Sequence, residues 1–135
     1  MIIYKNDQEV FDLIWHKFVV MKQAKNMNGD ECVYAHPGCF IGCLLTARDA
    51  KMLDKHRIVE SIMTINAILD TPEYERQKEK VKVFQRVRLQ FQNCNRYFLT
   101  ALQNIHDTFE PEEWRKLLID LAESYRLTVQ LDLEV

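Results

Sequence analysis

The chain has 135 residues, of which 47% are hydrophobic and 28% are charged, and this composition excludes an intrinsically disordered chain. Such a length is typical of one domain, which we expect to span residues 1–135. The net charge of -2 excludes the strongly basic character of a general nucleic-acid binder, and no apolar run approaches the about 20 residues of a membrane span.

The first predicted element is a helix over residues 7–25. Asn6, followed three residues later by Glu9, has the pattern of a capping box. The turn-forming sequence Asn28-Gly29-Asp30 is expected to end the helix. Apolar residues recur between these limits at helical spacing, at Phe11, Ile14, Trp15, Phe18 and Met21.

Residues 31–45 contain two short apolar runs on either side of a turn at His36-Pro37-Gly38. This pattern predicts a small β-hairpin. A helical turn that begins near Phe40 is the competing assignment, because short apolar runs are ambiguous. Gly42, inside the second run, indicates a bulge or a close approach of another backbone segment.

Two shorter helices are predicted in the middle of the chain. The pair Thr46 and Asp49 predicts an N-cap and a helix that ends near Leu53. Apolar residues at helical spacing over 58–69 predict the second helix. A further helix is expected to begin at Pro72, because proline is tolerated in a first turn.

The strongest pattern predicts one long amphipathic helix near residues 76–108. A shorter helix with Pro111 in its first turn follows, and alternating leucine and valine over 127–133 predicts a strand that could pair with the hairpin. The expected fold class is therefore α+β and predominantly α-helical, with about four to five helices and a small sheet. The long helix is marked by apolar residues seven positions apart, at Phe84, Phe91, Phe98 and Ile105.

The chain contains four cysteines, Cys32, Cys39, Cys43 and Cys94. Nothing in the sequence indicates secretion, so we expect reduced thiols in a cytosolic protein. With His36, the first three cysteines form a cluster on and beside a turn, and such ligands suit Zn²⁺. Because the cluster lacks paired CxxC motifs, small buried thiols are the other interpretation, and no cofactor is expected unless zinc binds there.

Gln103, His106 and Asp107 lie near the end of the predicted long helix. A helix-end histidine beside an aspartate is the simple structural interpretation of this group. If Cys43 lay close to His106, then Cys43, His106 and Asp107 would be a candidate for thiol nucleophilic chemistry. No local nucleophile signature surrounds Cys43, so an enzyme remains the alternative interpretation.

Charge is unevenly distributed, since residues 50–101 carry ten basic and six acidic groups and residues 102–135 carry three and eight. A nucleic-acid face would gather basic and aromatic residues on one side, whereas this run spreads around a helix. We therefore expect a solvated helix partly paired with the acidic C-terminal helix, and no nucleic-acid partner. The basic run consists of Arg76, Lys78, Lys80, Lys82, Arg86, Arg88 and Arg96.

Several segments stand in a characteristic order between residues 8 and 125. They are Lys22-Gln-Ala-Lys-Asn-Met27, Cys32-x-Tyr34, Gly38-Cys39-x-x-Gly42-Cys43-Leu-Leu45, and Leu102-Gln103-x-x-His106-Asp107 before Trp114. In this combination the chain resembles a group of small, uncharacterised proteins of bacteriophage and bacterial genomes. It departs from the pattern of that group at Ala35, where the group has arginine, and at Gly38, where the group has a basic residue.

The resemblance implies a setting more than a mechanism, because the group has no assigned activity. We expect a non-enzymatic, phage-type accessory protein of the bacterial cytosol that binds a host or defence protein, or a small ligand. The expected binding residues are Tyr34, Gln103, His106 and Asp107. The alternatives are the cysteine-dependent enzyme and a zinc-stabilised interaction module. Whether the chain is a monomer or a homodimer stays open.

Overall fold

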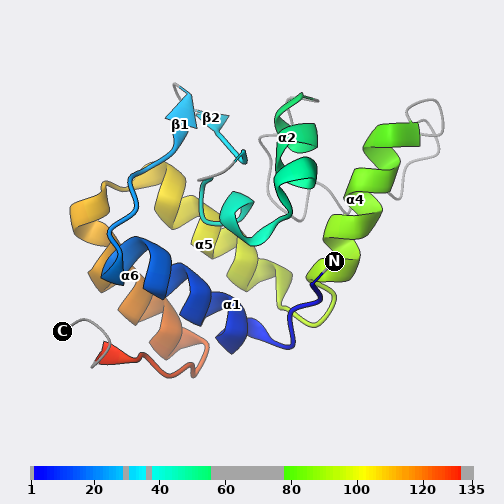
Figure 1. Ribbon diagram of the computed structural model, residues 1–135. Coiled ribbons are helices and arrows are strands. Elements are labelled where there is room, and N and C mark those ends of the chain that lie inside the picture. Colours follow the sequence, from blue (N-terminus) through cyan, green and yellow to red (C-terminus); the bar gives the residue numbers. More distant parts are fainter. Residues whose placement is uncertain (1, 29–30, 36–37, 56–77, 132–135) are drawn as a thin grey trace.

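The computed structural model describes residues 2–28, 31–35, 38–55 and 78–131. The expected helical character and number of helices are confirmed within these ranges. The helix predicted over 58–69 and the helix start predicted at Pro72 lie outside the described residues. The five described α-helices are α1 (Asp7–Ile14), α2 (Ala47–Lys55), α4 (Lys78–Gln90), α5 (Arg96–Thr108) and α6 (Pro111–Ser124) (Figure 1).

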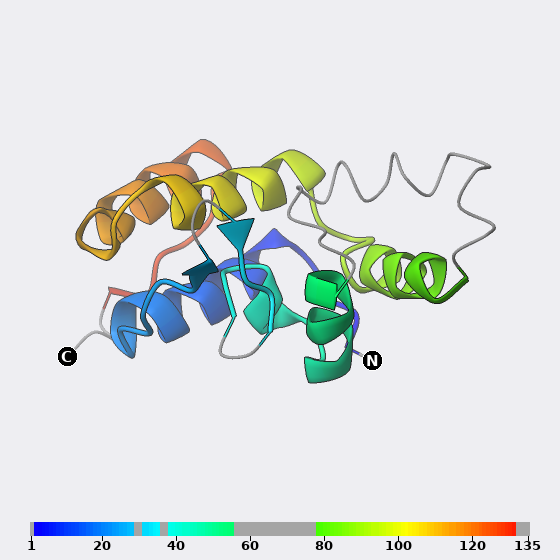
Figure 2. The same cartoon turned by 90° about the horizontal axis from the view of Figure 1, so that it is seen from above.

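The helices form two groups that meet at the turn between α4 and α5 (Figures 1 and 2). In the first group, α6 packs against α5 and against Trp15–Val20, the π-helix that continues α1. In the second group, α2 packs against α4. Residues 38–45 run between the two groups, so this segment occupies the middle of the molecule.

Helix α1 begins where it was predicted but ends earlier. The side-chain oxygen of Asn6 accepts a hydrogen bond from the amide of Glu9 at 2.9 Å, which confirms the predicted N-cap. The helix continues as a π-helix over Trp15–Val20. Lys22 then adopts a left-handed φ of 54°, so the predicted end near residue 25 is wrong.

The long helix predicted near residues 76–108 is in fact two helices, α4 and α5, separated by a turn over residues 91–95. Asn95 starts α5, because its side-chain oxygen accepts hydrogen bonds from the amides of Tyr97 (2.8 Å) and Phe98 (3.3 Å). The apolar spacing does not reveal this break, because both helices bury the same row of side chains in one core. Every member of that row is buried: Phe84, Phe91, Phe98 and Ile105.

Among the described residues of the range 31–45, the predicted hairpin is not formed. A short antiparallel pairing instead joins β1 (Met27–Asn28) to β2 (Glu31–Cys32). The competing assignment, a helical turn that begins near Phe40, describes the structure better, since Gly42–Leu44 form a 3-10 turn. Residues 38–45 are all buried, so they lack the alternation of buried and exposed positions that a hairpin with one face in water would show.

The strand predicted over residues 127–133 has no partner strand among the described residues, which end at Leu131. The side chain of Gln8 takes the place of a partner strand. Its Nε2 donates to the carbonyl of Thr128 at 2.8 Å, and its Oε1 accepts from the amide of the same residue at 2.8 Å. Leu127 and Val129 pack against the core. The alternating apolar residues therefore mark the side of this extended segment that faces the core, and the segment does not belong to a sheet.

Candidate functional site

The motif segment 38–45 passes through the core with two glycines in special positions. A Cβ atom placed on Gly42 would lie 2.6 Å from Cα and 2.8 Å from the carbonyl carbon of Tyr34. The close backbone approach predicted for Gly42 is thereby confirmed. Gly38 has a φ of 80°, in the left-handed region that favours glycine. The backbone structure therefore explains why both positions of the motif are glycine.

Side chains from distant parts of the sequence pair the buried backbone groups of this segment. The carbonyl of Leu44 accepts hydrogen bonds from the Tyr4 hydroxyl at 2.5 Å and from Gln90 Nε2 at 2.6 Å. The amide of Ile41 donates to Gln103 Oε1 at 3.2 Å. An unpaired buried backbone group costs about 1–3 kcal/mol, so these side chains hold the segment in its path.

The predicted group of Gln103, His106 and Asp107 forms one hydrogen-bonded network. The carboxylate of Asp107 accepts from Gln103 Nε2 at 2.7 Å and lies 2.8 Å from His106 Nδ1. The other ring nitrogen of His106, Nε2, accepts a hydrogen bond from the amide of Asn26 at 3.2 Å. Because Nε2 accepts, Nδ1 carries the proton that is donated to Asp107. Both ring nitrogens are therefore bound within the protein.

Aromatic rings enclose the imidazole of His106, which is 0% exposed. Its ring centroid lies 5.4 Å from that of Trp114, in a stacked arrangement, and 5.2 Å from that of Phe40. A third ring, Phe18, lies edge-on at 6.1 Å. His106 thus joins α5 to α6, to the chain before β1 and to the central segment.

Three of the four binding residues expected from the resemblance are buried in the fold, whereas the side chain of Asp107 is 25% exposed. The side chains of Tyr34 and Gln103 are buried, as is His106. The backbone amides of Tyr34 and Ala35 donate to the two carboxylate oxygens of Asp54 at 2.9 Å and 2.8 Å. These two hydrogen bonds fix the backbone at Tyr34 and Ala35 against α2.

The contacts of Cys43 do not support the predicted nucleophile. Its thiol donates to the carbonyl of Phe40 at 3.1 Å, while the polar partners of His106 are Asn26 and Asp107. Burial raises the pKa of the Cys43 thiol to about 11, and the nearby Lys17 lowers it only in part. A thiol with this pKa is almost entirely protonated near neutral pH, whereas the nucleophile is the thiolate.

The zinc alternative loses one ligand, because Cys39 is disulfide-bonded. A disulfide sulfur is not the thiolate that zinc requires, and the expectation of reduced thiols is wrong for this residue. Cys43 and Cys94 are free thiols. In the ranges that the structure describes, no group of three or more candidate ligands is arranged to hold a metal ion. His36 and the side chain of Cys32 lie outside the described part.

The basic run is paired differently from the prediction. Arg86 forms a two-pronged ion pair with Asp49 of α2, with Nη2 to Oδ1 at 2.7 Å and Nε to Oδ2 at 3.2 Å. Asp49 is buried and belongs to α2, whereas Arg86 belongs to α4. The ion pair therefore links α2 to α4, and it does not join α4 to the acidic C-terminal helix. Outside the described part lie Arg76 and the side chains of Lys78 and Lys80.

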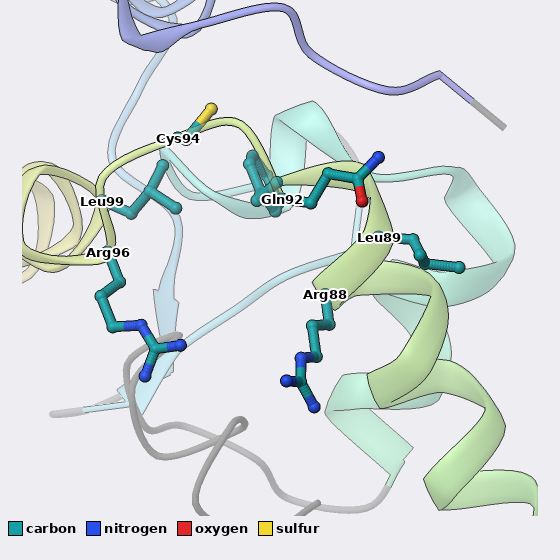
Figure 3. Close-up of a pocket in the computed structure, with 7 residues that line it drawn as sticks. Arg88, Leu89, Gln92, Cys94, Arg96 and Leu99 are labelled. Carbon is teal, nitrogen blue, oxygen red and sulfur yellow. The ribbon is translucent and has the colours of Figure 1, made fainter.

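A pocket of about 350 Å³ lies where α4 ends and α5 begins (Figure 3). Arg88 on α4 and Arg96 on α5 extend in the same direction on either side of it. Neither guanidinium has a hydrogen-bond or ion-pair partner among the described residues. The pocket lining contains no acidic side chain: it consists of Arg88, Leu89, Phe91, Gln92, Cys94, Arg96 and Leu99.

Sequence reasoning missed this pocket because it missed the break between α4 and α5. On one continuous helix, residues 88 and 96 would lie about 12 Å apart along the axis, with no concave surface between them. The turn places both arginines at one recess. Asn93 and Asn95 were the available signal, since asparagine favours turns and helix N-caps.

Within the described residues, no helix combines the length and the apolar character that crossing a membrane would need. The arginine-lined pocket is a concave site that the described residues offer to a ligand, whereas the side chains of Tyr34, Gln103 and His106 are buried. Comparisons with protein-family models, with curated proteins and with solved structures find no match for this chain.

Proposed function

We propose that this protein acts by binding a small anionic ligand in the pocket between α4 and α5, with Arg88 and Arg96 as the binding residues. The observation that carries the proposal is the presence of two guanidinium groups beside one pocket that has no acidic side chain in its lining. Two like charges at one recess repel each other, and an anion bound between them replaces repulsion by charge-assisted hydrogen bonds.

The wider setting proposed from the resemblance is a phage-type accessory protein, while the disulfide of Cys39 does not agree with the expected cytosolic location. The partner expected in this setting is a host or defence protein, or a small ligand. The pocket supports the small ligand, because a recess of about 350 Å³ is within the volume range of small-molecule sites. Binding without covalent chemistry agrees with the buried, protonated thiol of Cys43.

Thermal unfolding in sulfate and in phosphate, at constant ionic strength, tests the proposal. The proteins compared are the wild type, the double variant Arg88→Gln/Arg96→Gln, and Arg48→Gln. Arg48 is exposed on α2 and outside the pocket, so its variant is a control for lost positive charge. An anion at ten times its Kd stabilises the folded state by about 1.4 kcal/mol, which raises Tm by roughly 5 °C.

We expect this rise in the wild type and in Arg48→Gln, and a much smaller rise in the double variant. Sulfate and phosphate also stabilise proteins by exclusion from their surface, and that contribution is common to all three proteins. The measured quantity is therefore the difference between the wild type and the double variant. If both gain the same Tm at every anion concentration, the proposal is refuted.

A further inference from the structure

The positive charge of the pocket comes from two side chains and not from the start of α5. The first free amides of a helix can bind an anion, but those of Tyr97 and Phe98 donate to the side chain of Asn95. The helix dipole does not account for Arg96 either. Arg96 is the first residue of α5, and the partial positive charge of a helix N-terminus disfavours a cation there. An anion bound to Arg96 would offset this unfavourable placement.

The surface that the pocket offers to a ligand is polar. Phe91 and Leu99 are 3% and 1% exposed, so they form no wall for an apolar ligand body. Leu89 is half-exposed, but Figure 3 shows its side chain directed away from both guanidinium groups. A volume of about 350 Å³ lies near the lower end of the range for small-molecule sites. These features favour a small hydrophilic ligand.

Two guanidinium groups on separate helices match two separate carboxylates. One guanidinium fork pairs with both oxygens of a single carboxylate, so a second arginine calls for a second carboxylate. Arg88 belongs to α4 and Arg96 to α5, and they stand on either side of the pocket. A dicarboxylate carries a charge of -2 near neutral pH, which balances the two arginines. Two phosphate groups would carry about -3 to -4, more than two arginines neutralise.

We infer that the ligand of this pocket is a small dicarboxylate, with one carboxylate on Arg88 and the other on Arg96. This inference rests on the proposed function and names its ligand class. The proposed function requires only an anion at the arginines, whereas the inference requires two carboxylates on one molecule. Once the first carboxylate is bound, the second is held close to the other arginine, so the two pairings reinforce each other.

The test is an NMR titration of the full-length protein near neutral pH and at constant ionic strength. The probes are inorganic phosphate, acetate, and the dicarboxylates malonate, succinate, glutarate and adipate, in which the spacer lengthens by one CH₂ at each step. Backbone amides of residues 88–99 and the arginine Nε–H signals report binding at the pocket. We expect the best-fitting dicarboxylate to bind at least tenfold more tightly than acetate, because acetate pairs with only one arginine.

Single variants assign one carboxylate to each arginine. In Arg88→Gln and in Arg96→Gln, we expect the best-fitting dicarboxylate to bind within about threefold of acetate, because only one pairing remains. Arg48→Gln, the control for lost positive charge, is expected to leave the Kd of this dicarboxylate unchanged. All three arginines are exposed, so these variants retain the core.

The outcomes separate the inference from the proposed function. If phosphate or acetate binds in an arginine-dependent way but no dicarboxylate gains tenfold over acetate, the inference is overturned and anion binding stands. The same conclusion follows if only one of the two pocket variants weakens the best-fitting dicarboxylate. If no probe binds in an arginine-dependent way, the inference and the proposed function both fall.

Discussion

Replacing Gly42 by alanine tests how closely the central segment approaches the chain at Tyr34. In an unstrained turn, a change from glycine to alanine stabilises a protein by about 0.4–1 kcal/mol, because the unfolded chain has less conformational freedom. Gly42 lies in the turn Gly42–Leu44 and is not among the residues with positive φ, so its backbone conformation permits alanine. Any loss of stability must therefore come from the new methyl group and its neighbours.

Those neighbours are backbone atoms. The new Cβ would lie closest to the carbonyl oxygen of Tyr34 and 2.6 Å from its Cα, whereas ordinary contacts begin at 3.4 Å, so the two segments must separate by at least about 0.8 Å. Asp54 holds the amide of Tyr34 at 2.9 Å, and Gln103 holds the amide of Ile41 at 3.2 Å, which opposes this separation. Overpacking costs about 1–3 kcal/mol, and we expect a net loss near the top of that range, about 3 kcal/mol.

The measurement is urea unfolding followed by far-UV circular dichroism, without reductant so that the disulfide of Cys39 stays intact. Thermal unfolding gives a second readout, because a loss of about 3 kcal/mol lowers Tm by roughly 10 °C in a domain of this size. Ser124→Ala, at an exposed position of α6, is the control and should stay within about 0.5 kcal/mol of the wild type. A Gly42→Ala variant as stable as the wild type would refute the close approach.

Two further predictions concern the interior. Gln103→Leu removes the acceptor of the Ile41 amide and leaves that buried amide unpaired. We therefore expect urea titration to give an unfolding free energy about 1–3 kcal/mol below that of the wild type. An unchanged unfolding free energy would show that Gln103 does not hold the segment. Burial raises the pKa of Cys43 from about 9 to about 11. In the Cys94→Ala variant, which leaves Cys43 as the described free thiol, we expect the folded protein to react with iodoacetamide far more slowly than the urea-unfolded protein. Intact mass measures both rates. The sign follows from linkage: the stability contributed by the protonated thiol is complete below pH 9 and is lost as the pH rises toward 11. Equal alkylation rates in the two states would contradict the burial of Cys43.

Local chemistry made several helix starts predictable. The Asn6 cap of α1 was predicted, as was the Thr46 cap of α2, where Thr46 Oγ1 accepts from the amide of Asp49 at 3.2 Å. Pro111 begins α6 behind a capping box. A cap involves residues only three or so positions apart, so a short stretch of sequence contains all the information that it needs.

Burial was predictable as well, but chain direction was not. The apolar row from Phe84 to Ile105 is buried as the spacing indicates, yet the helix breaks over residues 91–95. The break depends on Asn95 and on contacts of the turn with the N-terminal segment, where the amide of Tyr4 donates to the carbonyl of Gln90 at 2.9 Å. Periodicity reports which side of a helix faces the core and is insensitive to a bend toward the same core.

The sequence by itself determined the helical class, the starts of α1, α2 and α6, and the buried faces of this protein. Only the tertiary structure decided the path of residues 38–45, the structural role of the glutamine and histidine near the end of α5, and the recess between Arg88 and Arg96. The physical reason is that buried backbone groups must find partners, and here the partners are remote in sequence. Leu44 pairs with Gln90 46 positions away, Ile41 with Gln103 62 positions away, and Asn26 with His106 80 positions away.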